Sequence, residues 1–193
     1  MGTGAKDSTT QKFAVGEAVV YPGRGVGRIS SIEEQEAAGF KLEVYVISFE
    51  RENAVVKIPT ARAAKQGLRK VSDAEAIEEA FEILTGRARK SRQMWSRRAV
   101  ELGGRINSGD IIQVAEVIRD LHRSEGEAEA SFSERGLYDS AIALLVQEVS
   151  ASRHITETEA MKLIQQSLGK APRRGAKAKD EDGEAGDDLS KVA

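Results

Sequence analysis

The stretch FKLEVYVISFE, residues 40–50, alternates so regularly in side-chain character that it predicts a β-strand. Apolar residues occur on both of its faces: Phe40, Leu42, Val44 and Val46 on one, and Tyr45, Ile47 and Phe49 on the other. A strand that is apolar on both faces is either central in its sheet or packs against something outside its own domain.

The segments on either side of this strand are also β-like, from Phe13 to about Val71. A turn rich in proline and glycine occupies residues 22–25, and a further short strand over residues 54–59 ends at a proline, as edge strands often do. Four or five short strands within about 55 residues predict a small SH3- or Tudor-like barrel.

The apolar pattern changes to a helical period at Ser72, where the sequence Ser-Asp-Ala-Glu fits a capping box. The periodicity and caps predict five helices: one ending at Gly86, one from about Ser91 to Leu102 that stops at Gly103-Gly104, one capped by residues 108–110, one from about Ser133 to Ser150, and one opening at Thr156. Short loops between them indicate a compact bundle. The predicted fold class is therefore α+β.

Four regions follow from this division of the chain. Residues 1–11 are expected to be a disordered tail, 12–70 a Tudor-like domain, 71–169 a helical domain, and 170–193 a disordered charged tail that runs from basic to acidic.

Composition excludes several classes of function. The 193 residues include no cysteine, so there is no disulfide framework, thiolate metal site or cysteine nucleophile. No apolar run approaches the roughly 20 residues that span a bilayer, and the N-terminus has no signal-peptide pattern. Neither histidine lies in a catalytic or metal-binding spacing, and GRGVG at 23–27 lacks the ending of a phosphate loop. We expect a cytoplasmic protein without enzymatic activity, metal, cofactor or small-molecule substrate.

The strongest local signal is the single tryptophan, Trp95, in a basic cluster. Residues 86–105 contain seven Lys or Arg against one acid, Glu101, a local charge of +6 in a chain of net charge −2. Such a local charge indicates a polyanion, and an aromatic ring within it can stack on or wedge between bases. A core role for the tryptophan fits the helical period equally well, because Ala99 and Leu102 follow at i+4 and i+7.

Several separated motifs, in order, resemble the CarD/CdnL family of bacterial transcription regulators. They are FAVGEAVVYP (13–22), GVG (25–27), VKIP (56–59), GLR (67–69), WSRR (95–98), SGD (108–110) and VAEVIRDL (114–121). The likeness extends from about Phe13 to Gly169.

The resemblance implies a Tudor-like domain that binds the β subunit of RNA polymerase and a helical domain that binds promoter DNA beside the transcription bubble. By the same resemblance, Trp95 would act as a minor-groove wedge at the upstream fork, and Arg97 and Arg98 would lie against the DNA backbone. The local charge adds Arg92 and Lys90 as further candidate DNA contacts. The polymerase-binding surface would include Ile47, Lys57 and Pro59, which we expect to form one exposed patch.

We therefore expect a monomer that stabilises the open promoter complex and reaches the nucleoid through RNA polymerase. The alternative is a stand-alone architectural DNA-binding protein whose β domain serves another partner; the acidic overall charge disfavours it.

Overall fold

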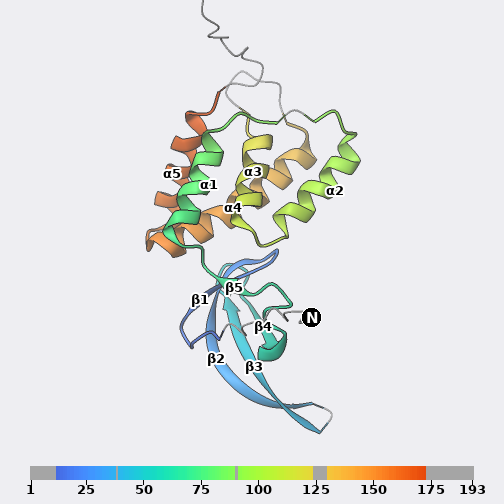
Figure 1. Ribbon diagram of the computed structural model, residues 1–193, viewed down its shortest axis with the longest axis vertical. Coiled ribbons are helices and arrows are strands. Elements are labelled where there is room, and N and C mark those ends of the chain that lie inside the picture. The colour runs from blue at the N-terminus through green and yellow to red at the C-terminus, as the bar shows by residue number, and fades with distance from the viewer. Residues whose placement is uncertain (1–11, 38, 90, 124–129, 173–193) are drawn as a thin grey trace, which may run out of the picture.

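The computed structural model describes residues 12–37, 39–89, 91–123 and 130–172. Its N-terminal part is one antiparallel sheet with the spatial order β4-β3-β2-β1-β5. The strands are β1 (Ala18–Tyr21), β2 (Gly25–Ala37), β3 (Phe40–Phe49), β4 (Ala54–Pro59) and β5 (Arg69–Lys70), with a short 3₁₀ helix, η1 (Thr60–Arg62), after β4. Strands β2 and β3 continue as a long hairpin away from the rest of the molecule (Figure 1).

The inner face of the sheet forms the first hydrophobic core. Tyr45, Ile47 and Phe49 of β3 are all buried there, and the ring of Phe13 packs edge-on against Tyr45 with centroids 5.6 Å apart. A β-bulge between Ile29 and Ser31 shifts the register of β2 against β3 and increases the local twist.

Five helices form the second core: α1 (Ala74–Thr85), α2 (Trp95–Ile106), α3 (Ile111–Leu121), α4 (Phe132–Arg153) and α5 (Glu157–Gly169). Eight of the eleven residues of α3 are buried, and α1, α2 and α4 all pack against it (Figure 1). The α+β class is thus confirmed. The predicted disordered ends, residues 1–11 and all of 170–193 beyond Pro172, lie outside the described residues.

Helices α1 and α2 do not have the boundaries predicted from the sequence. The cap of α1 is Asp73, whose side chain accepts a hydrogen bond from Ala76 N at 2.9 Å, because the hydroxyl of Ser72 instead donates to Glu148. Helix α2 starts at Trp95 and passes through Gly103-Gly104 to Ile106. Burial of Leu102 and Ile106, one turn apart, offsets the roughly 1 kcal/mol that each glycine costs in a helix.

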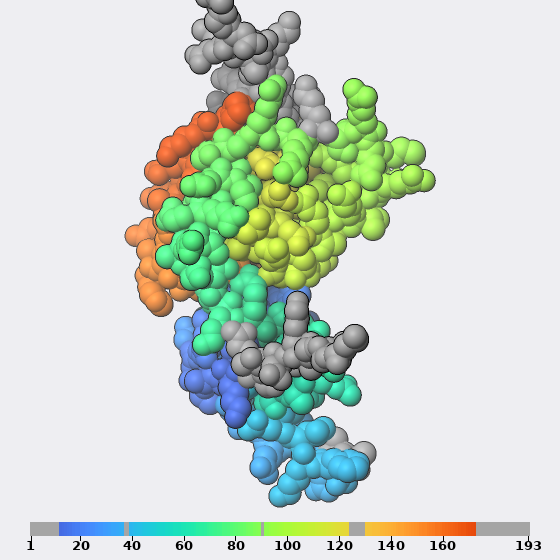
Figure 2. Space-filling view, in the orientation of Figure 1, coloured from blue at the N-terminus to red at the C-terminus, as the bar shows by residue number. Residues whose placement is uncertain are grey.

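The sheet and the bundle meet closely at the turn that precedes β2. Gly25 has φ +85°, and a Cβ at this position would collide with Gln147 Oε1 of α4, which accepts a hydrogen bond from Val26 N at 3.1 Å. Only glycine suits both requirements, so this glycine-rich segment is the predicted turn and also a point of close contact. Figure 2 shows the helices as one broad body and the sheet as a narrower one beside it.

Within the described part of the chain, no helix is both long and apolar enough to cross a membrane.

Candidate functional site

Trp95 is the first residue of α2, at the edge of the bundle. Its ring is partly buried against the helical core, and its Nε1 donates a hydrogen bond to Ser133 Oγ of α4 at 2.8 Å. The preceding residue, Met94, supplies no side-chain cap and is 72% exposed. The ring is therefore partly exposed, and its packing and hydrogen bond also give it a structural role.

The predicted basic residues divide into exposed and anchored side chains. Arg92 and Arg97 are exposed, and within the described residues neither takes part in an ion pair. Arg98 is partly buried, and its Nη2 lies 3.5 Å from the carbonyl oxygen of Asp120. Lys90 lies outside the described residues. Of the four predicted basic contacts, Arg92 and Arg97 are therefore the two that the structure describes as exposed and outside any ion pair among the described residues.

The chain before α2 is held by acids that lie far away in sequence. Arg89 N donates to Asp120 Oδ1 at 3.0 Å, and an Nη of Arg89 lies 3.4 Å from a carboxylate oxygen of Glu116, which also pairs with Arg105. Arg89 therefore has acidic partners that lie far from it in sequence. Helix α3 supplies the acids because it packs directly against α2.

The first turn of α4 lies beside Trp95 and is itself tightly bonded. Ser131 and Glu134 form a reciprocal capping box, and Arg123 Nη2 donates to both carboxylate oxygens of Glu134 at 3.1 and 3.0 Å. Burial raises the pKa of Glu134, but the hydrogen bond from Ser131 N and the charge of Arg123 outweigh it, so the pKa lies below its ordinary value.

The three residues predicted for the polymerase-binding patch do not share a face. Lys57 is exposed and Pro59 partly exposed on the outer face of β4, but Ile47 is 0% exposed in the inner core. The prediction of one exposed patch is wrong for Ile47 because successive residues of β3 point to opposite faces. Val46, opposite Lys57, and Val44, opposite Pro59, lie on the outer face instead, but both are buried.

Sequence reasoning therefore missed the residues that accompany Lys57. Its Nζ lies 2.9 Å from Glu33 Oε2 of β2, and this hydrogen bond lowers the pKa of Glu33. The same face continues along β3 to Leu42 and Phe40, the latter 73% exposed. The signal was present in the 40–50 alternation, since the face with two aromatic rings, Tyr45 and Phe49, is the one that forms the core.

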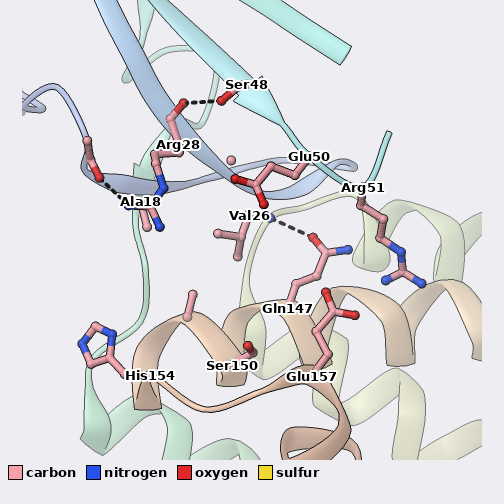
Figure 3. A pocket seen from close by; sticks show the side chains of 13 residues that line it. Ala18, Val26, Arg28, Ser48, Glu50, Arg51, Gln147, Ser150, His154 and Glu157 are labelled. Carbon is pink, nitrogen blue, oxygen red and sulfur yellow. Dashed lines mark hydrogen bonds between the residues drawn. The ribbon is translucent and has the colours of Figure 1, made fainter. Parts of the chain in front are cut away.

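A cavity of about 540 Å³ opens between the sheet and α4 (Figure 3). Its charged lining residues have both signs, with Arg28 and Arg51 near Glu50 and Glu157, and His154 at its edge. Mixed charge gives no preference for an anion or a cation. Among the residues described, no group of three or more His, Cys, Asp or Glu side chains could hold a metal ion.

Known protein families match the sequence in both the sheet and the helical part of the chain. Residues 13–72 match the model of the CarD-like/TRCF RID domain, and residues 79–165 match the model of the CarD C-terminal domain. A putative transcription factor of Bacillus subtilis, YdeB, is 33% identical over 147 residues, which cover 76% of this chain and 96% of that protein. The solution structure of the 72-residue N-terminal domain of Myxococcus xanthus CarD is 38% identical, with a TM-score of 0.28, and covers 36% of this chain and 93% of that domain.

Proposed function

The chain belongs to the CarD family of transcription regulators, and from that premise we propose that it binds the RNA polymerase β subunit through its sheet and stabilises the open promoter complex through its helices. Family members are regulators rather than enzymes, in agreement with the prediction of no catalytic activity. The observation that carries the proposal is Trp95, a partly exposed ring at a helix start, with the exposed Arg97 and Arg92 within three residues of it in sequence.

The DNA contact needs no chemistry. An apolar ring inserted at a distorted base step favours melted over closed DNA, so it shifts an equilibrium that already exists. A bias of about 1.4 kcal/mol changes that equilibrium tenfold. Contacts with phosphates would add affinity without sequence selectivity, and Arg97, Arg92 and Lys90 would make them. Arg98 would add a further contact from a side chain that is held near the carbonyl oxygen of Asp120.

The polymerase contact uses the outer face of the sheet. Lys57 and Pro59 lie on β4, an edge strand, and Val55 of the same strand is 64% exposed. An edge strand offers a partner both its unpaired backbone groups and its exposed side chains. Because Ile47, Val44 and Val46 are all buried, we propose that Val55, Lys57 and Pro59 of β4 form this contact. Binding here raises the local concentration of the helices at the promoter.

Hydrogen bonds to Glu148 join the sheet to the helices, and this connection supports the proposal of two binding surfaces in one protein. Arg69 of β5 forms a two-pronged ion pair with Glu148 of α4, with nitrogen–oxygen distances of 2.6 and 3.0 Å. Ser72 donates to the same carboxylate through both its backbone and its hydroxyl. Fixed geometry between the two binding surfaces would let polymerase binding set the position of Trp95.

The experiment compares binding to the isolated β subunit with binding to free promoter DNA. We expect micromolar or tighter binding to the β subunit, weak binding to DNA, and loss of the first in Lys57→Glu. Lys162→Glu, an equal charge change on the exposed side of α5, is the control and should bind normally. Tight DNA binding without β-subunit binding would contradict the proposal and support the stand-alone architectural alternative.

A further inference from the structure

The indole of Trp95 is bonded to a residue of another helix. Its Nε1 donates to Ser133 Oγ at 2.8 Å, a contact between residues 38 positions apart. The N–H is the only polar group of the indole and can only donate. We propose that Ser133 is a positioning residue, whose hydroxyl holds the ring in the orientation that meets DNA; the inference rests on the function proposed above.

Ser133 is well placed to hold the ring because its own turn is fixed. Its Oγ lies 3.3 Å from the hydroxyl of Ser131, the N-cap of α4. Ser131 bonds reciprocally with Glu134, and Arg123 holds the Glu134 carboxylate through two hydrogen bonds. A chain of polar contacts thus runs from Arg123, just beyond the end of α3, to the indole. A binding residue whose supporting neighbours are themselves hydrogen-bonded keeps its geometry when a ligand arrives.

Trp95 needs such a support because its own helix start provides little. No side-chain cap is present at Met94, and the residues on either side, Met94 and Ser96, are both exposed. A ring that could rotate freely would lose that freedom on binding DNA, whereas a ring already oriented loses less. The hydrogen bond therefore prepares the ring for the contact.

The bond also determines which part of the indole is available. Because Nε1–H is already paired with Ser133, it does not need a base as a partner, and DNA meets the apolar surface of the ring. A contact made by stacking or wedging tolerates different sequences, since every base has an aromatic face. If Ser133 instead competed with DNA for the N–H, removing its hydroxyl would strengthen the contact with DNA and lengthen the life of the open complex.

The first measurement follows the ring without DNA. Trp95 is the only tryptophan of the chain, so intrinsic fluorescence reports its environment alone. In the full-length protein, Ser133→Ala should increase quenching by acrylamide and lower the anisotropy, without changing the thermal midpoint. Ser133→Thr, which keeps the hydroxyl, should restore both signals. The control is Ser140→Ala on the same helix, whose exposed hydroxyl donates only to Gly136 O, and it should change neither.

The second measurement is the half-life of the open complex formed with RNA polymerase holoenzyme. Ser133→Ala should shorten it by about two- to tenfold, the effect expected from freeing one large side chain. In a Trp95→Phe background, which has no N–H to bond, adding Ser133→Ala should change nothing further.

Three outcomes would overturn the inference. If indole fluorescence is unaltered in Ser133→Ala, the bond does not hold the ring. An unchanged or lengthened half-life in Ser133→Ala, while Trp95→Ala shortens it, refutes the positioning role and leaves the proposed function intact. A normal half-life in folded Trp95→Ala refutes the proposed function, and the inference falls with it.

Discussion

The carboxylate of Glu148 joins the two parts of the protein, and its removal should uncouple them. It is 5% exposed and accepts four hydrogen bonds, two from Arg69 and two from Ser72. In Glu148→Ala, Arg69 would keep its charge in a partly buried position without this partner. Breaking one side of a buried ion pair costs about 3–5 kcal/mol.

That destabilisation is large compared with the roughly 5–15 kcal/mol by which domains are stable. At about 2–4 °C per kcal/mol for a chain of this size, the thermal midpoint should fall by roughly 6–20 °C. The thermal midpoint of Glu148→Gln should fall less, because an amide oxygen can still accept hydrogen bonds from Ser72.

Circular dichroism on heating, β-subunit binding and open-complex half-life should be measured on the same sample. We expect the folded variant to bind the β subunit and to form shorter-lived open complexes, because the geometry between the two surfaces is relaxed. Glu82→Gln, at an exposed position of α1, is the control and should behave as the parent protein. A parental midpoint together with a parental half-life in Glu148→Ala would refute the role of this junction.

Three further predictions concern single side chains. Ile47→Glu should unfold the sheet rather than only weaken polymerase binding, because it buries an unpaired charge; a parental circular dichroism spectrum with normal heat stability would contradict this. Arg97→Ala and Arg98→Ala should weaken DNA engagement about equally across sequences, and the double variant should reduce the slope of log affinity against log salt by about one for each phosphate that the protein no longer neutralises; an unchanged slope argues against phosphate contact. Because the pKa of Glu134 is lowered in the folded protein, its ionised carboxylate stabilises the fold fully above about pH 4.5, and this contribution is lost as the pH falls through the lower folded pKa. In Glu134→Gln, the thermal midpoint should therefore fall less steeply with decreasing pH on the acid side. Parallel plots of midpoint against pH for the two proteins would contradict this prediction.

The order of strands and helices was predictable because it depends on local patterns. The alternation over residues 40–50 and the caps at Asp110 and Thr156 each specify an element from a few neighbouring residues, and all three are present in the structure. The end of α2 was not predictable in this way, because Gly103-Gly104 favours termination locally and only packing of Ile106 against the core overrides it.

The candidate site was predictable in its residue types but not in its contacts. The density of cations around Trp95 is visible in the sequence, whereas its bond to Ser133 and the pairing of Arg89 with Glu116 arise from tertiary packing. The prediction that Ile47 is exposed was wrong because both faces of this strand are apolar, and the two aromatic rings on the face of Ile47, Tyr45 and Phe49, were not taken as the sign of the core.

The central claim is that Trp95 stabilises the open promoter complex, and its most direct test combines two measurements on Trp95→Ala. Because the ring is partly buried, we expect a modest loss of stability, about 1–2 kcal/mol, instead of the roughly 3–5 kcal/mol of a full core aromatic. β-Subunit binding should persist, and the open-complex half-life should fall about tenfold, with partial recovery in Trp95→Phe. A folded Trp95→Ala protein with an unaltered half-life would contradict the account and leave the arginines as the only DNA-facing candidates.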